Sequence, residues 1–142
     1  MSIMDPLPHD TPPKAQAGTP TAAVWRWFGA TGVFVSALVH LVLWFQGYRD
    51  IDVIGPMFLL NAGGGVVLTV AIIVWRHWLP LLGGIGFGVL TLTAYLLSAT
   101  VGFFGVLSPF EFAGTPEVIA AMADVTAAVG SGAALWRERR TS

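Results

Sequence analysis

The sequence lacks cysteine altogether and is poor in charged residues. Only 11% of its 142 residues are charged, whereas soluble domains carry about 25%. Without cysteine there are no disulfides, thiolate nucleophiles, iron–sulfur clusters or Cys-ligated zinc sites. The net charge is −1, and no basic patch lies outside the flanks of the apolar runs, so nucleic acid is not an expected partner. The low charge, together with a mean hydropathy of +0.73, predicts a membrane protein in a lipid bilayer.

Four long intervals contain no ionised side chain, or almost none. They are residues 27–46, 53–75, 79–110 and 118–136. Each is long enough to cross a hydrocarbon core of about 30 Å, which takes about 20 residues. A soluble helical bundle would need a polar face on each helix, which these intervals lack. The predicted fold is an all-α, four-helix transmembrane bundle over residues 24–137, with helices at about 24–46, 55–75, 80–104 and 117–136.

The two ends of the chain differ from the apolar runs in composition. Residues 1–23 contain five of the nine prolines, and such a composition predicts a disordered tail. This segment is not expected to be a signal peptide, because the first apolar run starts late and no cleavage site follows it. Residues 138–142 are predicted to form a short basic C-terminal tail.

Positive charge is distributed unevenly between the two expected sides of the membrane. One side holds Lys14, Arg26, Arg76, Arg137, Arg139 and Arg140, and the other holds only Arg49. Cytoplasmic segments carry the excess of Lys and Arg. Both termini are therefore predicted to be cytoplasmic, in a bacterial inner membrane.

A layer of polar side chains is predicted within the membrane. Asp124 lies inside the last apolar run, where a charge costs roughly 2.5–3.5 kcal/mol and normally faces a bundle interior. At 1.5 Å per residue, Asp124, His40 and Asn61 all lie about 8–12 Å from the outer ends of their helices. Tyr95 and Ser98 of the third helix add to this layer at a similar level.

The polar layer allows two interpretations. It is a proton or ligand site, in which His40 and Asp124 share a proton and Asn61 orients them. Alternatively, it is a hydrogen-bond cluster that fixes packing, at about 0.6 kcal/mol per pair. We favour the packing cluster, because so small a chain shows no conduction path. In both cases His40 and Asp124 are predicted to be direct or water-bridged partners, and the sequence leaves their protonation state open.

Small residues recur on every expected helix and predict close packing. Gly84 and Gly88 form a GxxxG pair, and the nearby GxGxG string is not a phosphate loop because no strand precedes it. The predicted packing positions are Gly32, Ser36, Gly64, Gly84, Gly88, Ala127 and Ser131.

No catalytic or cofactor signature is complete in this sequence. No nucleophile lies beside a base, and no His/Glu pair has the spacing of metal ligands. Haem held by two histidines does not fit, because His40 and His77 lie at different depths, while a site with one histidine stays open. We therefore expect no enzymatic activity, no metal and no cofactor.

Three short segments carry a resemblance to known proteins. They are His40-Leu41, Gly47-Tyr48-Arg49-Asp50-Ile51 and Phe58-Leu59-Leu60-Asn61-Ala62. Their arrangement resembles small four-span integral membrane proteins of actinobacteria that have no assigned activity. The resemblance implies a class of protein and assigns a role to no residue.

The predicted function is that of an accessory or scaffold subunit in a membrane complex. It would bind a membrane-protein partner, or a second copy of itself, through its small-residue faces. The alternative is a small proton-linked carrier or ligand-binding subunit that uses His40, Asn61 and Asp124.

Overall fold

The computed structural model describes residues 20–102, 107 and 114–141. These residues form the helices α1 (Pro20–Phe45), α2 (Ile54–Val74), α3 (Trp78–Thr100) and α4 (Thr115–Arg140), with a 3-10 turn, η1 (Tyr48–Asp50), between α1 and α2. Each α-helix is long and apolar enough to cross a membrane. The predicted all-α, four-span class is thus confirmed, while most of the predicted N-terminal tail lies outside the described residues.

Several helix ends differ from their predicted positions. Helix α1 begins at Pro20, so residues 20–23 are helical rather than part of the predicted disordered tail, and two C-terminal ends differ for local reasons. Helix α3 ends at Thr100, and Gly102 adopts a positive φ of 87° with its N–H bonded to the Leu97 carbonyl, as at many helix C-termini. Helix α4 continues to Arg140, so residues 138–140 are helical rather than part of a separate tail. The arginines of its last turn favour this extension, because they complement the helix dipole.

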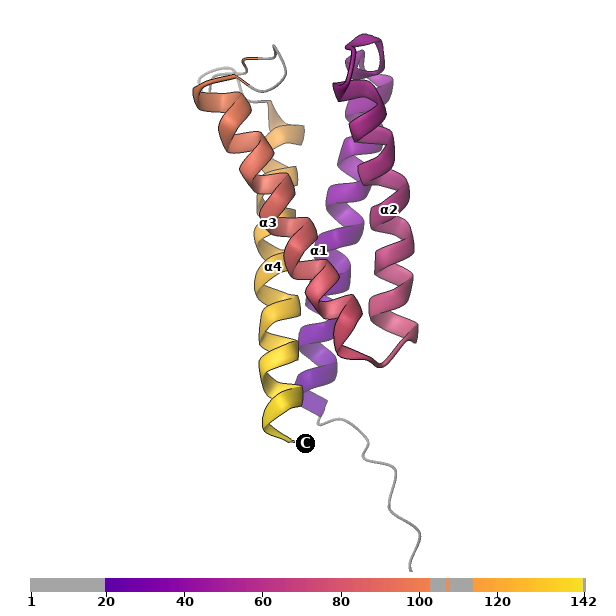
Figure 1. The fold of residues 1–142 in the computed structure, drawn as a ribbon, viewed down its shortest axis with the longest axis vertical. Helices are drawn as coiled ribbons and strands as arrows, with labels where there is room; N and C mark the ends of the chain where they lie inside the picture. The colour runs from indigo at the N-terminus through magenta and orange to yellow at the C-terminus, as the bar shows by residue number, and fades with distance from the viewer. Residues whose placement is uncertain (1–19, 103–106, 108–113, 142) are drawn as a thin grey trace, which may run out of the picture.

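The helices run up and down as an antiparallel bundle (Figure 1). The start of α1, the α2–α3 turn and the end of α4 share one end of the molecule, called here the terminal end. The α1–α2 connection and the start of α4 share the other, called the loop end. Helix α1 packs most extensively on α4 and then on α2, whereas α2 and α3 contact each other little. Figure 1 shows α2 and α3 close together at their turn and diverging toward the loop end.

Small residues bring the backbones of α1 and α4 into contact. A Cβ added to Gly32 would overlap the α4 backbone at Ala123 and Ala127, and one added to Gly130 would overlap Gly29. Ser36, Ala127 and Ser131 are completely buried. Close approach of this kind is how small residues stabilise helix pairs in membranes.

Helix α3 meets α4 through the two glycines of its GxxxG pair. A Cβ on Gly84 would overlap Ser131, and one on Gly88 would overlap the backbone carbonyl of Asp124. In α2 the packed glycine is Gly65, whose added Cβ would lie 2.6 Å from Ala37 Cβ. Gly64, the predicted packing residue, has nothing within 4 Å of that position. Within this chain, the packing position on α2 is therefore displaced by one residue from the prediction.

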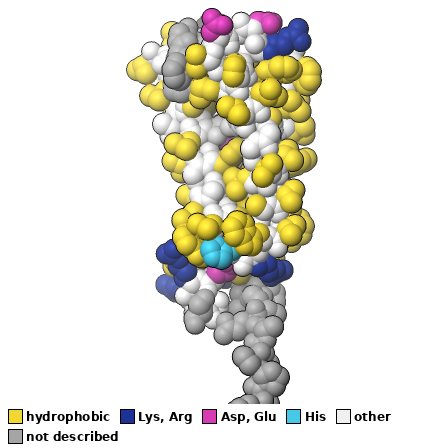
Figure 2. All heavy atoms as spheres, turned by 45° about the vertical axis from the view of Figure 1, so that its right-hand side comes forward, with side chains coloured by type: hydrophobic (Ala, Val, Ile, Leu, Met, Phe, Trp, Pro, Cys, Tyr) yellow, Lys and Arg dark blue, Asp and Glu magenta, His cyan; other side chains and the backbone are white. Residues whose placement is uncertain are grey.

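The hydrophobic core occupies the part of the bundle nearer the terminal end. Its buried members are Ala30, Val33, Ile72, Leu81, Ala127, Ala134 and Leu135. Apolar side chains cover the outside between charged groups at the two ends (Figure 2), as expected of helices surrounded by lipid.

Arg26 joins three segments at the terminal end. It is only 6% exposed, and its guanidinium donates to Glu138 at 2.5 Å, to the Ile72 carbonyl at 2.6 Å and to the His77 carbonyl at 2.8 Å. These bonds tie the start of α1 to the α2–α3 turn and to the end of α4. From the sequence Arg26 counted only as a boundary charge, because its partners are distant along the chain.

Candidate ligand cavity at the loop end of the bundle

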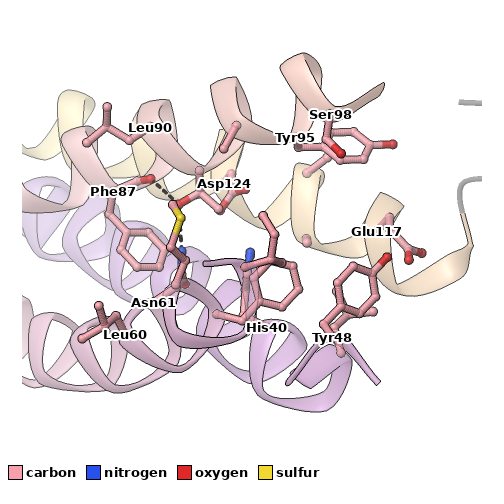
Figure 3. Close-up of a pocket in the computed structure, with 18 of the residues that line it drawn as sticks. His40, Tyr48, Leu60, Asn61, Phe87, Leu90, Tyr95, Ser98, Glu117 and Asp124 are labelled. Atoms are coloured by element: carbon pink, nitrogen blue, oxygen red, sulfur yellow. Dashed lines mark hydrogen bonds between the residues drawn. The ribbon is translucent and has the colours of Figure 1, made fainter. Parts of the chain in front are cut away.

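A cavity of about 420 Å³ lies in the half of the bundle toward the loop end and is lined by residues of all four helices (Figure 3). This volume falls within the range of about 300–1,000 Å³ that is typical of small-molecule sites. All members of the predicted polar layer, His40, Asn61, Tyr95, Ser98 and Asp124, line it. The residues predicted at matched depths on separate helices thus line one cavity. The prediction did not include three further polar residues of the lining, Tyr48, Thr91 and Glu117.

The walls of the cavity are mainly apolar and aromatic. The Phe58 ring stacks on Tyr48 with centroids 4.9 Å apart, and meets the His40 ring edge-on at 4.9 Å. Leu60 of α2 and Leu90 of α3 also line the cavity, yet they are 74% and 72% exposed. Because these helices diverge here, the two leucines lie where the cavity wall reaches the outer surface of the bundle.

Asp124 is the most deeply buried acid of the cavity. Only 1% of the residue is exposed, because Gly32 and Gly88 let α1 and α3 approach α4 closely on either side. The Ser36 hydroxyl is its hydrogen-bonding neighbour, and the carboxyl oxygen Oδ1 has no partner. A buried carboxyl with an unpaired oxygen is costly, since such an acceptor loses about 1–3 kcal/mol of hydration.

His40 does not bond Asp124 directly. Its Nδ1 lies 2.8 Å from the Ser36 carbonyl oxygen, which can only accept, so this nitrogen carries a hydrogen. A neutral His40 ring then has Nε2 as an acceptor. No hydrogen bond or ion pair joins His40 to Asp124, and Ser36 contacts both residues. A direct hydrogen bond, one of the two forms predicted from the sequence, is therefore not made in this structure, where Ser36 contacts both residues. The water-bridged form stays a prediction.

Asn61 is held by Thr91 rather than by the predicted pair. The Thr91 hydroxyl donates to the Phe87 carbonyl at 2.8 Å, so its oxygen can only accept from Asn61 Nδ2, which lies 3.0 Å away (Figure 3). This chain fixes the amide orientation and leaves Asn61 Oδ1 without a partner. Asn61 thus presents an acceptor oxygen and does not orient His40 or Asp124.

Glu117 places a second carboxyl on the same side of α4. It precedes Asp124 by seven residues, or about two turns and 10 Å along the helix. Its Oε2 is buried and without a partner. The sequence indicated Glu117 only as an acid of the first helical turn, because a cavity wall cannot be recognised from one helix.

The unpaired buried side-chain atoms of the described residues gather at this cavity. They are Asn61 Oδ1, Glu117 Oε2, Asp124 Oδ1 and Ser131 Oγ, and the first three belong to residues that line it. The amide oxygen of Asn61 is an acceptor, and the two carboxyl oxygens are acceptors when their groups are ionised. The arrangement can therefore receive hydrogen-bond donors.

Comparisons with protein-family models, with curated proteins and with solved structures find no match to this chain. Among the residues that the structure describes, no group of three or more His, Asp or Glu side chains is placed to hold a metal ion.

Proposed function

We propose that this small multi-pass membrane protein binds an amphiphilic molecule in the cavity between its four helices. The observation that carries the proposal is that three residues lining one mainly apolar cavity, Asn61, Glu117 and Asp124, each have a buried oxygen without a partner. An apolar pocket with a few convergent polar groups is the usual form of a small-molecule site. The apolar part of the molecule would fill the cavity, and its polar group would donate hydrogen bonds.

A cluster that only fixed packing would have a different pattern of hydrogen bonds. Buried polar groups in folded proteins are nearly always paired, and a packing cluster would pair them with one another. Here the hydrogen bonds of Asn61 and His40 run to Thr91 and Ser36, and acceptors on three cavity residues stay unpaired. This pattern supports ligand binding over the packing interpretation favoured from the sequence.

The accessory or scaffold function has less support from the same structure. Gly32, Gly84 and Gly88 were predicted as helix-packing positions, within the chain or between copies, and each lies against α4 of its own chain. A second protein cannot use these faces without separating the bundle. Binding to a partner or to another copy stays a prediction.

We place the protein in a bacterial inner membrane with both termini in the cytoplasm. The start of α1 and the end of α4 lie at one end of the bundle (Figure 1), and the described arginines are concentrated there. This arrangement supports the orientation derived from the positive charges. The cavity then lies in the outer half of the membrane.

Filling the cavity tests the proposal. Ala94 lines it, whereas the neighbouring Thr93 is exposed on α3. We expect wild-type protein extracted in native lipid nanodiscs to retain an amphiphile, detected by native mass spectrometry. Thr93→Trp, the matched control, should retain it, and Ala94→Trp should lose it while keeping its melting temperature within a few degrees. Retention by Ala94→Trp, or no bound molecule in the wild type, would contradict a ligand in this cavity.

A further inference from the structure

We propose that the ligand is a lipophilic amine whose ammonium group binds at Asp124 and Asn61. This inference rests on the proposed function and names the chemical class of the molecule. Both side chains reach into the cavity, one from α4 and one from α2 (Figure 3). Asp124 is only 1% exposed, and its Oδ1 has no partner.

The buried side-chain atoms of the described lining that have no partner are oxygens, which accept hydrogen bonds when the carboxyls are ionised. They are the carboxyl oxygens of Asp124 and Glu117 and the amide oxygen of Asn61. A neutral His40 adds Nε2, since its Nδ1 donates to the Ser36 carbonyl. An ammonium has three N–H donors and no acceptor, so it can pair with several of these atoms at once. A hydroxyl offers one donor and adds lone pairs, while a phosphate or carboxylate offers only acceptors.

The charges of the lining favour a cation. Glu117 and Asp124 line the cavity, and no Lys or Arg is among the described residues that do so. Arg26 is bound to Glu138 at the terminal end, and Arg49 lies 3.6 Å from Asp50. Buried charges are normally paired, and a cationic ligand would supply the missing partner for Asp124.

The shape and walls of the cavity favour a ligand in which that cation is attached to an apolar group. Leu60 of α2 and Leu90 of α3 line the cavity and are exposed on the outside of the bundle, where a membrane would bring them into contact with lipid. Phe58, Phe87 and the two tyrosines of the lining are aromatic, and aromatic faces attract cations. A volume of about 420 Å³ accommodates an aryl or alkyl chain of moderate length.

Three probes of equal length separate the effects of charge and hydrogen bonding. They are 4-phenylbutylamine, 4-phenylbutanol and 4-phenylbutyltrimethylammonium. At pH 7.5 the amine is a cation with N–H donors, because alkylamines such as Lys titrate near pH ~10.4. The alcohol is a neutral donor, and the quaternary compound has the charge without a donor. Affinities are measured by calorimetry on the full chain in nanodiscs, with empty nanodiscs subtracted.

We expect the amine to bind roughly 10- to 100-fold more tightly than the alcohol, because hydrogen bonds that involve charged groups are the strong ones. The quaternary compound should bind more weakly than the amine. Asp124→Asn should lower the affinity for the amine by a similar factor and change that for the alcohol by less than about threefold. Asp52→Asn, the control, removes an exposed carboxyl of the α1–α2 connection and should change neither affinity.

Failure of the inference is distinguishable from failure of the proposed function. Equal or tighter binding of the alcohol, displaced by Ala94→Trp, would overturn the amine assignment and leave a cavity that binds neutral amphiphiles. Amine binding that Ala94→Trp leaves unchanged would overturn the site. The comparison of probes on wild-type protein decides the ligand class even if Asp124→Asn does not fold.

Discussion

Ser36 is the residue through which His40 and Asp124 are connected. Its carbonyl accepts from His40 Nδ1, and its hydroxyl lies beside the ring at 3.4 Å and within hydrogen-bonding reach of the Asp124 carboxyl. From the sequence, Ser36 was assigned to helix packing because it lies in line with Gly32. The structure gives it both roles, since a serine is small enough for the α1–α4 interface and still carries a polar group.

Replacing Ser36 by alanine should lower the free energy of unfolding by about 1 kcal/mol, the scale of an interhelical hydrogen bond in a membrane. Alanine keeps the close packing but leaves the Asp124 carboxyl with less hydrogen bonding. In a double-mutant cycle, Ser36→Ala and Asp124→Ala should be coupled, because each removes the same contact. Stability is measured by denaturant unfolding in detergent. Thr126→Ala is the control, as that exposed hydroxyl bonds only the Met122 carbonyl of its own helix. Additive effects would show that Ser36 does not bond Asp124.

The partners of individual polar residues were the part that sequence could not provide. Depth along a helix follows from the residue count. It predicted His40, Asn61 and Asp124 at one level, and in the structure all three line the cavity. The direction of a side chain around the helix axis changes by about 100° per residue. Which neighbouring helix a side chain faces also depends on how its own helix is rotated in the bundle. For this reason Asn61 was assigned to the wrong partner, and Thr91 was not recognised at all.

At the scale of the elements, apolar length was a sufficient guide to the number and order of helices. The ends were less predictable, because they depend on local hydrogen bonds such as that of Gly102 to Leu97. The same uncertainty about helix rotation explains why Gly64 was predicted as the packing residue. Of these two adjacent glycines, it is Gly65 that meets another helix. The GxxxG pair on α3 was recognisable because its spacing places both glycines on one face.

The glycines of α3 offer a matched test of helix packing. A leucine at Gly88 would overlap the Asp124 carbonyl and push α3 away from α4. We expect Gly88→Leu, and likewise Gly84→Leu, to lower the melting temperature in detergent by 10 °C or more, about the effect of a 2–4 kcal/mol loss in a domain of this size. Gly86→Leu is the control, because nothing lies within 4 Å of its added Cβ. It should be neutral or slightly stabilising, since glycine is a poor helix former. Equal effects at the three positions would show that this face of α3 does not contact α4.

At the scale of the whole molecule, the two ends of the bundle differ in construction. Toward the terminal end, the apolar core and the bonds of Arg26 hold α1, the α2–α3 turn and α4 together. Toward the loop end, α2 and α3 diverge (Figure 1), and the cavity lies among the helices. This difference provides a fixed base and a side opening in a chain of only 142 residues. The sequence does not reveal this difference, because the divergence of α2 and α3 depends on how the helices pack against one another.

The orientation in the membrane decides which leaflet the cavity faces, and accessible cysteines can test it. The chain has no native cysteine, so single replacements at Asp52 and Thr141 are unambiguous. Both positions are exposed, one in the α1–α2 connection and one after α4. Because the arginines are concentrated at the terminal end, we expect Asp52→Cys to react with an impermeant maleimide on intact cells. Thr141→Cys should react only after the membrane is made permeable. The reverse pattern would place the cavity in the cytoplasmic leaflet, where a lipophilic amine would have to enter from the cell interior.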